Sequence, residues 1–274
     1  MAALVDDQGR GDVESAASRP CATLGAVLNV HAVLALGRSR PPIVLVHGAA
    51  NSASVWRFWQ ADLARRGWSS WALDLRGHGG SPATDLGRTS MADYADDVAT
   101  LARDLARPAV LMGWSMGGLA AMLAAVRGRV AGYVGLAPSP PVRERNASVP
   151  LRAATFDASE YGVTSTDLDD QPTMADLDAE ERRIALASLA LESRFARDDR
   201  KAGIVLTSLP CPALVVASTG DATFPPPAYA DLSVPAERLV VDGATHWGLV
   251  LNRRLLATLV PTVTAWLEHA SGGT

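Results

Sequence analysis

Short apolar runs alternate along this chain with longer segments in which apolar residues recur at helical spacing. The runs at residues 43–46, 68–73 and 108–112 have the length and composition of buried strands. The residues between them, 55–66 and 91–106, have a helical period. This order predicts a mostly parallel sheet that is covered by helices on both faces.

The same alternation continues toward the C-terminus and also extends toward the N-terminus. Residues 24–35 can supply one or two opening strands before the first buried run. The later elements are predicted as a helix at 119–126, strands at 130–136, 212–217 and 238–241, and a final helix at 253–269.

Residues 139–202 interrupt this pattern. Strand-like runs disappear and acidic residues become frequent. One amphipathic helix is predicted in this segment, with four apolar side chains on one face: Ile184, Ala187, Leu191 and Phe195. Such an insertion between core elements is most simply a helical cap.

The chain therefore divides into three parts. Residues 1–20 form an N-terminal extension, and residues 21–138 together with 203–274 form an α/β core. Residues 139–202 form the helical cap that is inserted into this core.

A serine flanked by glycines lies at a predicted turn from strand to helix. Ser115 follows the run at 108–112, and Gly113 and Gly117 lie two positions before and after it. A β-carbon at either glycine would clash where the chain doubles back, and the turn leaves the serine hydroxyl exposed above the sheet edge. The segment therefore predicts a nucleophile elbow.

Composition limits the classes of protein that can carry this serine. The chain of 274 residues is 48% hydrophobic and 20% charged, as in ordinary globular proteins. Its net charge of −4 provides no basic field for nucleic acid. No apolar stretch approaches the roughly 20 residues needed to cross a bilayer. We therefore expect a soluble protein with no nucleic-acid or membrane partner.

The N-terminal residues and the cysteines indicate the compartment. Residues 1–20 include Asp6 and Asp7, where a secretory signal would be basic and then apolar. Cys21 and Cys211 are isolated and lack the spacing of a metal site. A cytoplasmic protein with reduced cysteines is expected.

Four motifs occur in one order along the chain: His47-Gly48, the segment 74–81, the elbow at Ser115, and the late pair Asp221 and His246. Because of these motifs and their order, the chain resembles a small capped α/β-hydrolase. The resemblance extends from about residue 24 onward, except in the cap. The elbow is similar to that of pimeloyl-carrier-protein methyl ester esterases. The resemblance implies a doubly wound, mostly parallel sheet of about eight strands with a helical cap insertion.

A serine nucleophile needs a base that accepts its proton and an acid that orients the base. His246 follows the last predicted strand, where the family places its base. Asp221 follows the strand before it and gives the order Ser, Asp, His. Asp242 is a competing acid, but it lies only four residues before His246 and is expected to cap a turn. Residues 137–139, where some relatives carry the acid, contain no carboxylate.

The reaction also needs donors for the oxyanion, and family analogy points to backbone amides. The N–H of Met116, directly after the nucleophile, and the N–H of Ala49 are the expected donors. Ala50 is the alternative to Ala49. Trp114, Ala50 and Trp247 are expected to line the substrate pocket.

Two features near the predicted site are expected to be structural. Asp74 and Arg76 should brace loops beneath the pocket, as in other proteins of this family. His78 has no neighbouring ligands that would make a metal site. The proposed chemistry requires no cofactor or metal.

A serine at position 115 argues against dehalogenases and epoxide hydrolases of this fold, which attack with aspartate. The resulting prediction is a serine hydrolase that cleaves a carboxylic ester of a small to medium substrate through an acyl-serine intermediate. C–C bond, lactone or thioester hydrolysis on the same triad is the alternative. A hydrolase-fold binding protein or receptor is a further alternative from a different class. The oligomeric state is left open.

Overall fold

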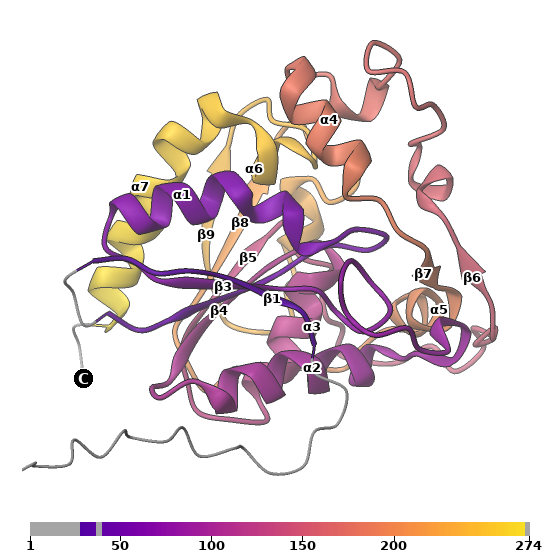
Figure 1. Ribbon diagram of the computed structural model, residues 1–274. Helices are drawn as coiled ribbons and strands as arrows, with labels where there is room; N and C mark the ends of the chain where they lie inside the picture. The colour runs from indigo at the N-terminus through magenta and orange to yellow at the C-terminus, as the bar shows by residue number, and fades with distance from the viewer. Residues whose placement is uncertain (1–27, 37–39, 272–274) are drawn as a thin grey trace, which may run out of the picture.

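The computed structural model describes residues 28–36 and 40–271 (Figure 1). Its main sheet has seven strands in the order β1-β3-β2-β4-β5-β8-β9. Their bounds are β1 (Val30–Val33), β2 (Ile43–Val46), β3 (Ser70–Leu73), β4 (Ala109–Trp114), β5 (Val130–Leu136), β8 (Ala213–Ser218) and β9 (Glu237–Val241). β1 runs antiparallel to β3, and the other neighbours are parallel. The predicted mostly parallel sheet is confirmed.

The number of strands differs from the expected eight or so. The described residues contribute seven strands to this sheet, and the opening segment supplies β1 alone. Residues 24–27 of that segment, and the extension at 1–20, lie outside the described residues.

Helices cover both faces of the sheet, as the alternating pattern predicts. One face carries α1 (Arg57–Arg65), α6 (Gly248–Leu251) and α7 (Arg253–Ser271), and the other carries α2 (Met91–Asp104) and α3 (Met116–Ala125) (Figure 1). Each face has its own apolar cluster: Trp56, Trp59 and Val263 are buried on the first, and Tyr94 and Leu119 on the second. The core therefore consists of two layers separated by the sheet.

Short 3-10 helices occupy several of the connections. Their bounds are η1 (Ala53–Trp56), η2 (Leu86–Arg88), η3 (Ala158–Tyr161), η4 (Pro172–Met174) and η5 (Pro226–Tyr229). In the part of the chain that the structure describes, no helix is both long and apolar enough to cross a membrane.

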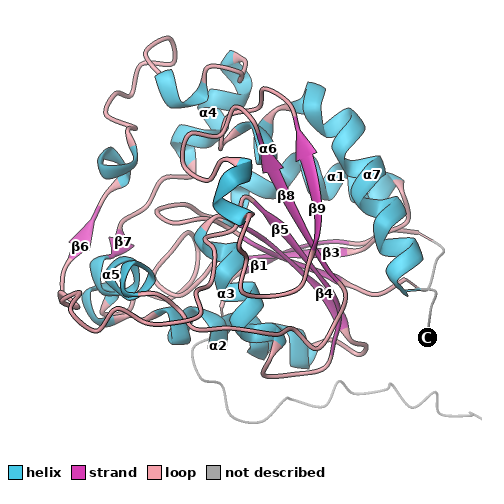
Figure 2. Cartoon of the chain, turned by 180° about the vertical axis from the view of Figure 1, so that it is seen from behind, coloured by secondary structure: helices cyan, strands magenta, loops and turns pink. Residues whose placement is uncertain are grey.

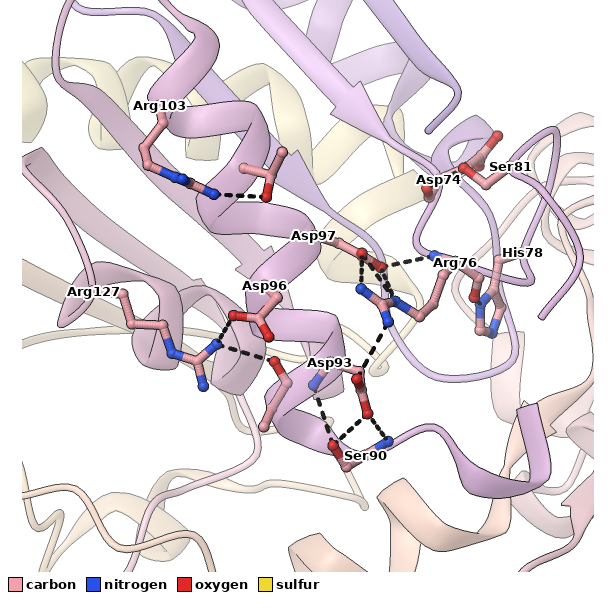
Figure 3. A network of polar contacts seen from close by, with 12 residues as sticks. Asp74, Arg76, His78, Ser81, Ser90, Asp93, Asp96, Asp97, Arg103 and Arg127 are labelled. Atoms are coloured by element: carbon pink, nitrogen blue, oxygen red, sulfur yellow. Dashed lines mark hydrogen bonds and ion pairs between the residues drawn. The ribbon is translucent and has the colours of Figure 1, made fainter. Parts of the chain in front are cut away.

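The N-terminus of α2 is fixed by its own side chains. Ser90 accepts a hydrogen bond from the Asp93 amide, and the Asp93 carboxylate accepts one from the Ser90 amide (Figure 3). This reciprocal capping satisfies two of the free amides at the helix start. This capping stabilises the start of α2, the helix that the loop after β3 contacts through Arg76.

The segment between β5 and β8 lies at one end of the sheet (Figure 2). It contains α4 (Ala179–Ala187), α5 (Arg194–Ala202) and a small antiparallel pair, β6 (Thr155–Phe156) with β7 (Glu192–Ser193). These elements lie within residues 139–202, where a helical cap insertion is predicted, and they include two short strands that the sequence did not predict.

The prediction of a single amphipathic helix in the cap is wrong. The chain forms two helices, and Leu191, expected on the apolar face, is 54% exposed. Contacts with the core interrupt the helix: the Ser188 hydroxyl donates to the side chain of Asn51, and the Ala190 amide donates to the Ala50 carbonyl. These long-range bonds prevail over the local helical period.

Candidate active site

Ser115 lies at the junction of β4 and α3, in a conformation that is rare for a residue with a side chain. Its φ is 57° and its ψ is −123°. A β-carbon on Gly113 would lie 2.3 Å from the Gly117 carbonyl oxygen, and one on Gly117 would lie 2.2 Å from the carbonyl oxygen of His47. The glycines therefore permit the close approach predicted from sequence. Such strained backbone is typical of functional sites.

His246 and Asp221 are in direct contact. Nδ1 of His246 lies 2.7 Å from Oδ2 of Asp221, so the ring donates its Nδ1 proton to a carboxylate that is fully buried. The amides of Thr223 and Phe224 donate to the other carboxylate oxygen at 2.7 and 3.0 Å. Burial acts to raise the pKa of Asp221, but the hydrogen bond and charge of His246 together with these amides lower it. Asp221 is therefore held as a carboxylate.

Asp242, the competing acid, faces elsewhere. Its Oδ1 accepts a hydrogen bond from the Thr219 hydroxyl at an exposed turn. The Gly243 amide donates to the same hydroxyl. These contacts are those of a turn cap, and the structure pairs His246 with Asp221 instead.

The loop that carries His246 is held from two sides. The indole N–H of Trp114 donates to the His246 carbonyl at 3.1 Å. From the cap, Asp176 accepts hydrogen bonds from the amide and hydroxyl of Thr245. These bonds fix the backbone at Thr245 and His246, from which the ring reaches Asp221.

One pocket contains both Ser115 and His246. Its volume is about 190 Å³, and the indoles of Trp114 and Trp247 are among its walls. Ala50, the third residue expected in this lining, is fully buried, and its neighbours Ala49 and Asn51 line the pocket instead. Tyr161, Arg200 and Phe224 line other parts of the wall.

The two candidate oxyanion donors in the loop after β2, Ala49 and Ala50, differ in the hydrogen bonds of their amides. The Ala50 amide donates to Oε2 of Glu192 at 2.9 Å and is therefore not free to bind an oxyanion. Among the described residues, the Ala49 amide has no hydrogen-bond acceptor, and Ala49 lines the pocket. Met116 is the first residue of α3, where backbone amides lack an intrahelical acceptor.

A buried ion pair lies beneath this loop. Nε2 of His78 is 3.4 Å from Oε2 of Glu192, and both side chains are fully buried. The Tyr94 hydroxyl donates to the other Glu192 oxygen at 2.6 Å. Burial opposes the charge on both members, but the charge of His78 with these hydrogen bonds lowers the pKa of Glu192 to about 2, and Glu192 raises the pKa of His78.

His47 forms a different, neutral contact next to this pair. Its Nε2 accepts a hydrogen bond from the Leu75 amide, and its Nδ1 donates to the Gly48 carbonyl. Burial and the nearby charge of His78 lower the pKa of His47 to about 4. A neutral His47 therefore joins the loop after β2 to the one after β3.

Asp74 and Arg76 have the bracing contacts expected of them. Asp74 accepts hydrogen bonds from the amides of Ala53 and Gly80, and Arg76 binds both oxygens of Asp97 on α2 (Figure 3). Neither residue lines the pocket. Within residues 28–36 and 40–271, no group of three or more His, Cys, Asp or Glu side chains is arranged to hold a metal ion.

Sequence reasoning did not find several polar residues around the site. Glu192, Asp176 and Arg200 belong to the cap, which contains no motif that marks them. Asn51, whose side chain donates to the Ala49 carbonyl, follows the His-Gly motif and could have been suggested by that position alone.

Known proteins share the fold of this chain. A model described as the alpha/beta hydrolase family matches residues 43–258. The chain therefore belongs to the α/β hydrolase family. A thermophilic esterase from Thermogutta terrifontis has the same fold, with a TM-score of 0.64 and 22% identity over 89% of this chain and 94% of its own.

Two groups of relatives similar in sequence to this chain are named as esterases. Pimeloyl-[acyl-carrier protein] methyl ester esterase of Serratia marcescens is 30% identical over 187 residues, which are 68% of this chain and 67% of that protein. Protein phosphatase methylesterase 1 of Mus musculus is 37% identical over 105 residues, or 36% of this chain. That second match spans only 27% of the mouse protein.

Proposed function

We propose that this protein is a serine hydrolase that cleaves a carboxylic ester of a small to medium substrate through an acyl-serine intermediate. The observation that carries the proposal is the presence of Ser115 and the Asp221-bound His246 in one pocket. Membership of a family whose matched relatives include two methyl esterases supports ester chemistry.

The proposed reaction has two halves. His246 accepts the Ser115 proton as the hydroxyl oxygen attacks the ester carbonyl, and then gives that proton to the departing alcohol. A water molecule next loses a proton to His246 and attacks the acyl-serine, which releases the acid and restores the Ser115 hydroxyl. Asp221 holds the ring and stabilises the imidazolium in both halves.

The backbone amides of Ala49 and Met116 are the proposed oxyanion donors. They stabilise the negative charge that forms on the carbonyl oxygen during each attack. The bond from Ala50 to Glu192 supports Ala49 rather than Ala50 in this role. Because the Glu192 carboxylate is fixed by several donors, it holds the loop after β2 in one conformation.

Turnover separates this proposal from a binding protein or receptor built on the same fold. The purified protein should release many equivalents of 4-nitrophenol from 4-nitrophenyl acetate, and Ser115→Ala should lose nearly all of that turnover while remaining folded by circular dichroism. Release of a single equivalent would favour a receptor. Undiminished turnover by Ser115→Ala would exclude the serine mechanism.

A further inference from the structure

The pocket that contains Ser115 has a permanently charged side chain in its wall. Arg200, near the end of α5, is partly buried and lines this pocket. Its guanidinium donates to two neutral oxygens, the Ser139 hydroxyl at 3.2 Å and the Tyr161 hydroxyl at 3.0 Å. Nε is buried and has no hydrogen-bond partner among the described residues. Since a guanidinium has five N–H groups, three have no acceptor among the residues that the structure describes.

Several other arginines of the cap, among them the two nearest on α5, have acidic partners. Arg194 and Arg197 on the same helix both pair with Glu160, and Arg152 pairs with Asp198 at 2.6 Å. Within the described part of the chain, no carboxylate lies within ion-pair distance of Arg200. An arginine stays charged, and a partly desolvated charge without a counter-ion is costly. An anion that enters the pocket would relieve this cost.

The guanidinium is linked to the elbow through one residue, and Arg200 and Ser115 line the same pocket. The Ser139 hydroxyl that accepts from Arg200 belongs to a residue whose amide donates to the Ser115 carbonyl at 2.9 Å. Arg200 therefore contacts a residue that is itself bonded to the elbow. A short substrate that places its ester at Ser115 can extend its far end to this side chain.

We propose that Arg200 determines specificity by binding a carboxylate on the substrate, so that the preferred substrates are monoanionic esters such as half esters of short dicarboxylic acids. This inference rests on the proposed ester hydrolysis and adds the charge of the substrate to it. A carboxylate is the best match because its two oxygens accept paired N–H donors. The volume of about 190 Å³ is below the roughly 300–1,000 Å³ of sites for drug-sized ligands, which favours short chains.

Kinetics with a matched pair of esters tests the assignment. The value of kcat/KM is measured for monomethyl glutarate and for neutral dimethyl glutarate with the wild type, Arg200→Gln, Arg200→Lys and Lys201→Gln. Lys201 is the next residue, is exposed and is outside the pocket lining, so its variant removes the same charge elsewhere. The ratio of the anionic to the neutral value should fall about 10-fold to 100-fold in Arg200→Gln.

The ratio of the two kcat/KM values distinguishes substrate recognition by Arg200 from a purely structural role of this residue. Loss of the hydrogen bonds to Tyr161 and Ser139 would slow both esters together and leave the ratio unchanged. Arg200→Lys should keep part of the preference, and Lys201→Gln should keep all of it. An unchanged ratio in Arg200→Gln would overturn the assignment.

A binding measurement separates failure of this inference from failure of the proposed function. In the Ser115→Ala background, calorimetry should show tighter binding of monomethyl glutarate than of dimethyl glutarate, and Arg200→Gln should abolish the difference. If the wild type hydrolyses neither ester but this preference is present, the anion site stands and ester hydrolysis fails. Equal binding of the two esters would refute the anion site whatever the turnover.

Discussion

At the scale of single residues, the site depends on which carboxylate orients His246. Asp221 is buried and bonded to Nδ1 of the ring, whereas Asp242 is bonded to Thr219. Asp221→Asn should therefore lower kcat by about 10⁴-fold, because the amide favours the wrong tautomer of the imidazole. Asp242→Asn serves as the matched control and should retain kcat within a few-fold. Steady-state rates with an aryl ester decide between them, and the reverse ranking would mean that Asp242 is the acid.

At the scale of elements, β7 fixes the loop after β2 through the buried pair of Glu192 and His78. Glu192→Gln removes one charge from this pair and should destabilise the fold by about 3–5 kcal/mol near neutral or mildly acidic pH. The measurement is urea unfolding of wild type and variant. Tyr94→Phe, which removes only a hydrogen bond to Glu192, should cost less, about 1–2 kcal/mol.

The stability that the pair contributes should depend on pH. The pKa of His78 is raised above 6.5 in the folded protein, so its contribution is complete below pH 6.5 and is lost as the pH rises through the folded value. The pKa of Glu192 is lowered from 4.5 to about 2, so its contribution is complete above pH 4.5 and is lost toward pH 2. The effect of Glu192→Gln should be largest between pH 4.5 and pH 6.5 and should become smaller as the pH rises through the raised pKa of His78. An effect that stays constant as the pH rises above 6.5 would contradict titration of His78 in this pair.

At the scale of the whole molecule, the cap contacts the loop that carries His246. Asp176 of the cap holds Thr245, the residue before the catalytic histidine candidate, and also accepts from Asn252. Asp176→Ala should lower kcat/KM by about 10-fold to 100-fold because it releases the loop that positions His246. Asp169→Ala, at an exposed position of the cap, is the control and should have little effect. Equal activity of the two variants would show that the cap does not position the loop.

The sequence predicted the core of this molecule much better than its cap. Strands such as β2 and β5 and the elbow at Ser115 follow from local patterns, because buried strands and glycine-dependent turns are determined by adjacent residues. The break between α4 and α5 depends on Ser188 and Ala190 reaching Asn51 and Ala50, far away in the chain. Local periodicity contains no information about such contacts.

The residues of the site fall into the same two groups: those that the local sequence predicts and those that it does not. Ser115, Asp221 and His246 follow the ends of parallel strands, which bring them to one edge of the sheet, so their positions in the chain were informative. Glu192 and Arg200 approach from the cap, and no motif marks them. The pocket lining at Ala49 and Asn51 rather than Ala50 is a matter of loop geometry that sequence does not provide.

The most direct test of the account is the site at which a serine-directed reagent attaches. The wild-type protein and His246→Ala are treated with a fluorophosphonate, digested, and analysed by peptide mass. The wild type should be labelled rapidly on the peptide that contains Ser115, and labelling of the variant should be greatly slowed, because His246 is the proposed base for that serine. Labelling on another residue, or equal labelling of Ser115 in both proteins, would contradict the serine mechanism.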